Sequence, residues 1–117
     1  GRLDFIAHRA NFILHPVLAL VEGDALGHLR LNPDEVAEVF QVPLDHLRNE
    51  PPLEYRYDLV PRPDENFPYD LIGIPRDYRW QIGGEDVPVY PWKGHVIWGL
   101  TGRITRHLTA LLEEAGV

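Results

Sequence analysis

The distribution of proline divides this chain more sharply than any other sequence feature. Eight of the 11 prolines fall within residues 51–91, whereas residues 95–115 contain none. Proline lacks the backbone N–H that a helix or strand ladder uses, and it disfavours helical conformation in the residue before it. We therefore expect loops and short strands in residues 51–91 and an uninterrupted helix in residues 95–115.

The expected helix has one apolar face. Glycine costs about 1 kcal/mol relative to alanine inside a helix, so Gly99 and Gly102 in its first turns indicate close packing of the helix on a sheet. His95 stands at its expected start, and Gly116 stands where a helix often ends. Apolar residues recur at the spacing of three to four typical of an amphipathic helix, at Ile97, Leu100, Ile104, Leu108, Leu111 and Leu112.

Two further segments predict strands on the basis of apolar runs and turn residues. The short apolar run at residues 17–21 is typical of a strand buried on both faces. Residues 78–82 and 87–90 flank a Gly-Gly-Glu-Asp sequence at residues 83–86, which predicts a hairpin with its turn there.

Residues 32–42 combine a helix start with an alternating segment. Asn32, Pro33 and Glu35 have the pattern of a capped first turn, and only about one turn is expected to follow. Residues 36–42 predict a strand that places Glu38 on the same face as apolar neighbours, among them Phe40.

Composition limits the classes of partner. A chain of 117 residues corresponds to one domain. Its 11 basic and 18 acidic residues give a net charge of −7, and Lys93 is its only lysine, which argues against nucleic acid as a partner. No apolar run approaches the ~20 residues that cross a bilayer, so no membrane partner is expected. The absence of cysteine fits a cytoplasmic location.

Three stretches in a fixed order resemble one known family. They are NPDEVAEVFQVPL at residues 32–44, VYPWKGH at residues 89–95 and VIWGLTGRIT at residues 96–105. Together they resemble the C-terminal half of a Nudix hydrolase of the coenzyme A diphosphatase type. The opening residues 1–4 also resemble the segment that follows the catalytic helix in that family.

The resemblance implies an α/β fold, specifically a Nudix-type α/β/α sandwich with a mixed sheet, of which residues 1–117 form an incomplete C-terminal portion. It implies an enzyme that uses Mg²⁺ or Mn²⁺ to cleave coenzyme A or acyl-CoA into phosphopantetheine and an adenosine bisphosphate. Coenzyme A or a related nucleotide diphosphate is then the expected ligand. The missing N-terminal half or a second copy of the chain is the expected protein partner, because one long helix cannot cover both faces of a buried sheet.

The metal-binding motif of the family, G-x5-E-x7-R-E-U-x-E-E-x-G-U, would lie before Gly1. We therefore expect this chain alone to hold no metal and to be inactive. The tail with Glu113, Glu114 and Gly116 matches only the last part of that motif, because Thr109 and Ala110 replace its arginine and glutamate. Nor does the spacing of the six histidines predict a metal site.

Glu38 is the candidate catalytic residue. Nudix enzymes sometimes take a further metal ligand or a general base from outside the motif, and Glu38 lies in the first matching stretch. The alternative is a structural ion pair at a strand edge. Glu35 is explained by the helix start. Cations that are candidates for contacting substrate phosphates are Arg56, Arg62, Arg76, Arg79 and Lys93.

Two other functions stay open. One is a catalytically inactive, Nudix-derived module that binds a nucleotide or a protein. The other is an unrelated small α+β domain. The coding sequence upstream of Gly1 would separate the enzyme from the binding module, because only the enzyme needs the spaced glutamates.

Overall fold

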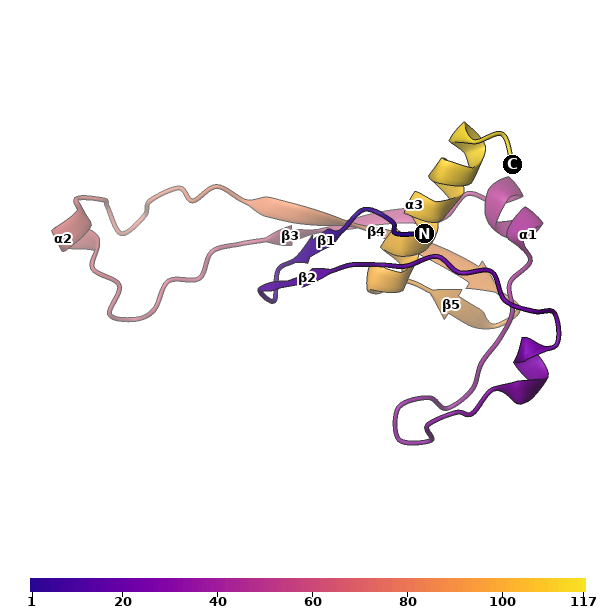
Figure 1. Ribbon diagram of the computed structural model, residues 1–117. Coiled ribbons are helices and arrows are strands. Elements are labelled where there is room, and N and C mark those ends of the chain that lie inside the picture. Colours follow the sequence, from indigo (N-terminus) through magenta and orange to yellow (C-terminus); the bar gives the residue numbers. More distant parts are fainter.

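The best packed part of the computed structural model, which describes residues 1–117, is a three-stranded sheet with one helix across it (Figure 1). The strands are β3 (Leu53–Leu59), β4 (Gly83–Trp92) and β5 (His95–Ile97), in the order β3-β4-β5, and the helix is α3 (Gly99–Glu114). Only four residues of the chain are buried, and they all lie where α3 meets β4: Pro88, Tyr90, Gly102 and Thr105.

Gly102 allows α3 to approach the sheet closely. A Cβ atom at this position would lie 2.6 Å from the carbonyl oxygen of Pro88, inside any normal contact distance. The expected reason for this glycine is therefore confirmed. Close packing is the wrong explanation for Gly99, because a Cβ there would meet nothing within 4 Å. Gly99 instead has φ +63°, which glycine adopts at little cost.

The helix is confirmed, but it begins at Gly99 rather than at residue 95. His95 belongs to β5, which follows a two-residue turn in which Lys93 and Gly94 both have positive φ, as tight hairpins require. The expected end is confirmed. Gly116 has φ +69°, and the N–H of Val117 donates back to the carbonyl of Leu112.

The residues of α3 that pack most tightly on β4 are small, Gly102 and Thr105. The hydroxyl of Thr105 is satisfied within the helix by donating to the carbonyl of Thr101 at 2.8 Å. Ile97, the first member of the predicted apolar stripe, lies in β5 rather than in the helix, and the members within α3 are half-buried or exposed. No leucine or isoleucine on the apolar face of α3 is therefore fully buried.

The predicted hairpin turn at residues 83–86 is wrong. These residues form the first part of β4 and pair antiparallel with β3, Gly83 opposite Leu59 and Asp86 opposite Arg56. Residues 78–82 form no strand. A complete ladder with β3 outweighs the local turn preference of two glycines, since cross-strand pairing stabilises a sheet more than propensity does.

The N-terminal part of the chain contains little regular structure. Strands β1 (Ile6–His8) and β2 (Phe12–Leu14) form a hairpin, and a 3-10 helix (Ala25–His28) and α1 (Leu44–Asn49) follow. The predicted strand at residues 17–21 is wrong, since only Val17 forms a bridge and Leu20 is 99% exposed. The predicted strand at residues 36–42 is also wrong. Neither segment finds a partner strand to complete its backbone hydrogen bonds.

The expected single turn at Asn32 is confirmed. The carbonyl of Asn32 accepts from the N–H groups of Glu35 and Val36, at 3.1 and 2.8 Å. The side-chain Oδ1 of Asn32 accepts from the N–H of Asp34 at 3.1 Å. Glu35 contributes its backbone to this turn, but the expectation that its carboxylate caps Asn32 is wrong, because that carboxylate makes no hydrogen bond.

Residues 60–82 connect β3 to β4 as a long arm that carries the short helix α2 (Tyr69–Ile72) at its far end (Figure 1). The expected loop structure is confirmed in this stretch. The arm extends the molecule to 64 × 37 × 29 Å and its radius of gyration to 19.9 Å, against about 13 Å for a compact chain of this length. Four aromatic side chains of the arm contact one another: Phe67, Tyr69, Tyr78 and Trp80.

The fold is α/β in general, with helices beside two small sheets. All strand pairs are antiparallel, so these strands do not form the mixed sheet that the resemblance implies. A helix crosses one face of the larger sheet (Figure 1). None of the helices has both the length and the hydrophobicity needed to cross a lipid bilayer.

Candidate functional site

Glu38, the predicted catalytic residue, lies beside His95. Its Oε1 atom is 3.5 Å from Nδ1 of the imidazole. Glu38 comes from the loop after the Asn32 turn, and His95 opens β5, so the contact joins two segments that are far apart in the sequence. The side chain of Glu38 is 68% exposed and that of His95 is 30% exposed.

Phe40 holds the imidazole from a second direction. Its ring stacks on that of His95 with 4.2 Å between centroids and 10° between planes. The ring of His95 thus packs on one face against Phe40 and has the Glu38 carboxylate near Nδ1, and its Nε2 atom makes no hydrogen bond within the protein. A carboxylate that orients an imidazole through Nδ1 leaves Nε2 available to accept or donate a proton.

The imidazole opens onto a groove of about 450 Å³. The groove also contains Lys93, whose Nζ lies 5.0 Å from the ring centroid of Trp92. Lys93 is placed there by the turn between β4 and β5, so an ammonium group and an imidazole face the same space. Such a pair attracts an anion such as a phosphate. The groove is lined by Phe40, Gln41, Val42, Pro43, Trp92, Lys93 and His95.

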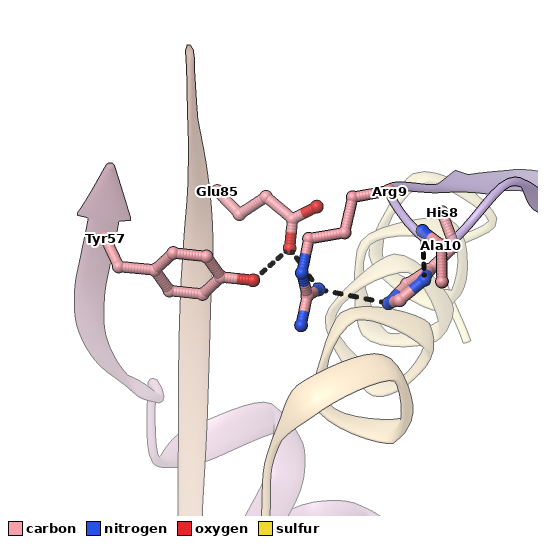
Figure 2. A network of polar contacts seen from close by, with 5 residues as sticks. All are labelled: His8, Arg9, Ala10, Tyr57 and Glu85. Atoms are coloured by element: carbon pink, nitrogen blue, oxygen red, sulfur yellow. Dashed lines mark hydrogen bonds and ion pairs between the residues drawn. The ribbon is translucent and has the colours of Figure 1, made fainter. Parts of the chain in front are cut away.

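A second polar cluster connects the sheet to the N-terminal hairpin (Figure 2). The hydroxyl of Tyr57 on β3 donates to Oε2 of Glu85 on β4 at 2.5 Å. The same oxygen accepts from Nη1 of Arg9 at 3.2 Å. Beyond Arg9, the backbone N–H of Ala10 donates to Nδ1 of His8 at 3.1 Å.

These contacts shift two proton equilibria in opposite directions. The hydrogen bond to Glu85 raises the pKa of Tyr57, because it favours the protonated phenol. The same bond lowers the pKa of Glu85, and the nearby charges of Arg9 and Arg103 lower it further. The glutamate is therefore ionised at neutral pH.

Sequence reasoning missed this cluster. Tyr57 and Glu85 are direct cross-strand partners, but the sequence analysis placed Glu85 in a turn and therefore could not pair it with β3. Among the other predicted phosphate contacts, Arg56 is paired with Asp86 at 3.0 Å, and Arg76 lies over the ring of Tyr69 in the arm. Only Lys93 lies near Glu38 and His95.

No group of three histidine, aspartate or glutamate side chains lies close enough to hold a metal ion. The Glu38 and His95 pair supplies two ligands at most, and Glu113 and Glu114 lie exposed at the end of α3 without a third partner. The side chains of this chain do not by themselves fit a Mg²⁺ or Mn²⁺ centre.

Comparison with protein-family models, with curated proteins and with solved structures gives no significant match to this chain. The family resemblance therefore depends on the matching stretches themselves.

Proposed function

We propose that this chain is the C-terminal portion of a metal-dependent pyrophosphohydrolase that resembles the coenzyme A diphosphatases. The complete enzyme would be a Nudix-type α/β/α sandwich in the cytoplasm that cleaves coenzyme A or acyl-CoA into phosphopantetheine and an adenosine bisphosphate. Its Mg²⁺ or Mn²⁺ would be held by a segment outside these residues, because the side chains present here do not form a metal centre.

One observation supports the proposal more than any other. The first stretch that carries the resemblance supplies Phe40 and the second supplies Lys93 and His95, and these side chains line one groove. Glu38, also from the first stretch, lies outside the lining and contacts His95. The resemblance depends on residue order alone, so the spatial contact between the matching stretches is a separate observation. Residues that match a family only by chance have no reason to meet at one site.

In the proposed role, His95 moves a proton at Nε2, to or from the water or the phosphate oxygen at the cleaved bond. Glu38 remains the candidate catalytic-site residue, and in this geometry it acts by orienting the imidazole and stabilising its charged form. Lys93 would hold a phosphate oxygen of the diphosphate. The chain would need its missing N-terminal half, or a second copy, to complete the fold.

The test compares the 117-residue chain with the same chain extended by its own upstream coding sequence. We expect the extended protein to release phosphopantetheine from coenzyme A in Mg²⁺ or Mn²⁺, and the 117-residue chain to release none above background. An extended protein that binds coenzyme A without hydrolysing it would instead support the inactive binding module.

Substitutions in the extended protein test the roles of the two side chains. Glu38→Gln and His95→Asn should each lower kcat at least about tenfold with little change in KM, and His95→Asn should also remove one limb of the pH profile. Glu22→Gln is the control, since Glu22 is exposed and its carboxylate makes no hydrogen bond or ion pair. A turnover of Glu38→Gln within about twofold of the control would contradict the role of Glu38.

A further inference from the structure

Strand β3 is an open edge of the larger sheet. In the order β3-β4-β5 it pairs with β4 on one side only, and six of its seven residues, Leu53 to Asp58, are exposed. Strands in globular proteins usually have about five or six residues, so this edge is not a short one. An open edge presents a row of backbone N–H and C=O groups to which another strand can bind.

Pro88 shows which backbone groups of β3 face the open side. It lies opposite Glu54, it has no N–H, and its carbonyl oxygen faces Gly102 of α3. The two residues therefore form a pair without ladder hydrogen bonds, and such pairs alternate with hydrogen-bonded ones along an antiparallel ladder. Glu54, Arg56 and Asp58 accordingly direct their N–H and C=O groups away from β4, where these groups have no partner in the protein.

The strand also lacks the features that usually keep an edge from pairing. It contains no proline and no lysine, and its register with β4 runs from Leu53 to Leu59 without a bulge. Its charges are of both signs, so a second strand with the complementary order of charges is attracted. One face of β3 is apolar or aromatic and the other is charged, with Leu53, Tyr55, Tyr57 and Leu59 on the first and Glu54, Arg56 and Asp58 on the second.

The order of these charges limits how two copies of β3 can pair. Two identical antiparallel strands are related by a two-fold axis, which places one residue opposite itself. An axis at Arg56 also places Glu54 opposite Asp58, so like charges meet throughout. An axis at Glu54 or at Asp58 places a carboxylate opposite itself. An axis at Tyr55 instead places Glu54 opposite Arg56 on both sides, with the two tyrosines between them.

An axis at Tyr57 is the remaining register with opposite charges, since it pairs Arg56 with Asp58. Tyr57 is already engaged, because its hydroxyl bonds to Glu85 and the guanidinium of Arg9 lies 5.5 Å from its ring centroid. It is 38% exposed, against 60% for Tyr55. Tyr55 is thus the more accessible of the two residues, and the register centred on it is favoured.

We propose that β3 binds β3 of a second copy of this chain, antiparallel and with the two-fold axis at Tyr55. Two three-stranded sheets then join into one of six strands. Two cross-strand pairs of Glu54 with Arg56 fix the register, and residue 60 of one copy lies level with residue 50 of the other. The arm that follows β3 therefore passes α1 of the second copy. This contact surface does not depend on the proposed enzymatic function.

Sedimentation of the 117-residue chain over a range of concentrations tests the pairing, since a small interface predicts an equilibrium of monomer and dimer. Glu54→Arg places two arginines opposite each other, and Arg56→Glu places two glutamates opposite each other. Each substitution alone should weaken dimerisation at least about tenfold. An equimolar mixture of the two variants restores opposite charges at both pairs and should recover the dimer. A folding defect cannot produce this recovery, because each variant is the same protein alone and in the mixture.

Arg30→Glu is the matched control, since it makes the same change of charge at an exposed residue outside β3. Cross-linking tests the register, because the chain contains no cysteine of its own. In the proposed register the two Tyr55 Cα atoms lie about 4.5 Å apart, which a disulfide can span. Mild oxidation should therefore cross-link Tyr55→Cys into a dimer but not Leu20→Cys, although Leu20 is 99% exposed.

A chain that stays monomeric at every concentration would overturn the proposal. So would a dimer that Glu54→Arg and Arg56→Glu weaken no more than Arg30→Glu does, or a mixture of the two variants that stays monomeric. The protein extended by its upstream sequence should dimerise in the same way, and a monomeric extended protein would show that an upstream strand occupies the edge instead. None of these outcomes uses hydrolysis of coenzyme A, so failure of the enzymatic proposal leaves this one standing.

Discussion

The sheet with α3 and the N-terminal residues 1–43 have similarly apolar stretches but very different packing. All four buried residues belong to β4 and α3, and none belongs to residues 1–43. β4 has β3 on one edge and β5 on the other, whereas residues 17–21 have a single bridge at Val17. Hydrophobicity alone therefore does not produce a strand. A strand also needs a neighbour for its N–H and C=O groups and a layer to cover it.

The uncovered surface has an energetic consequence. Leu20 and Val21 are 99% and 71% exposed, and Leu71 at the end of the arm is 84% exposed. At ~25 cal/mol per Å², a few hundred Å² of exposed apolar surface forgoes several kcal/mol, comparable to the whole stability of a small domain. This supports the proposal that a second copy or an N-terminal half covers these segments.

Hydrogen exchange should show the largest difference between the two regions. We expect backbone amides in β4 and α3 of the 117-residue chain to exchange about a thousandfold more slowly than amides in residues 15–43, because only the former lie in a packed, hydrogen-bonded unit. Mass spectrometry with peptide resolution measures both in one sample. A hydrophobic dye should also bind the chain.

If the amides of residues 17–21 and 36–42 exchange as slowly as those of β4, the two regions do not differ in packing as described. It would mean that both segments form strands in solution, as their apolar patterns predict. Protection that appears only at high protein concentration would identify a second copy as the missing neighbour.

The two regions also show what the sequence could and could not predict. The helix ending at Gly116 and the turn at Asn32 depend on local patterns, and both were predictable. The register of β3 against β4, which pairs Tyr57 with Glu85, depends on contacts between distant segments and left no local signal. Glu38 lies beside His95, but His95 was expected on the helix, so the pair itself was not predicted, and the catalytic role of Glu38 stays a prediction.

A single added methyl group at Gly102 should weaken the packing of α3 on β4. Gly102→Ala places a Cβ against the Pro88 carbonyl, and the loss from this overlap should exceed the gain of about 1 kcal/mol in helix propensity. We expect a net loss of about 1–2 kcal/mol in the free energy of unfolding, measured by urea denaturation.

Gly27→Ala is the matched change in the N-terminal region. A Cβ there would meet no atom within 4 Å, so its effect should stay within about 0.5 kcal/mol. Equal effects of the two substitutions would show that α3 does not rest on β4 as closely as described.

The smallest effect is expected at the contact between the two regions, where Arg9 of the β1–β2 hairpin forms an ion pair with Glu85 of β4 (Figure 2). The folded pKa of Glu85 is lowered, so its contribution to stability is complete above its ordinary pKa of 4.5 and is lost as the pH falls through the folded value. The folded pKa of Tyr57 is raised, so its contribution is complete below its ordinary pKa of 10.0 and is lost as the pH rises through the folded value.

Glu85→Gln should therefore remove part of the loss of stability in acid and bring the pKa of Tyr57 back toward its ordinary value, because the phenol loses the carboxylate that holds its proton. Stability is measured by urea denaturation across the acid range, and Tyr57 is followed by NMR titration of labelled tyrosine. Asp86→Asn is the control, since Asp86 is the neighbouring carboxylate on β4 and pairs with Arg56 instead. If Asp86→Asn lowers the pKa of Tyr57 as much as Glu85→Gln does, general negative charge rather than the hydrogen bond causes the shift. Arg9→Gln should then raise the pKa of Glu85 only slightly, because the phenol contributes most to the shift and the guanidinium less.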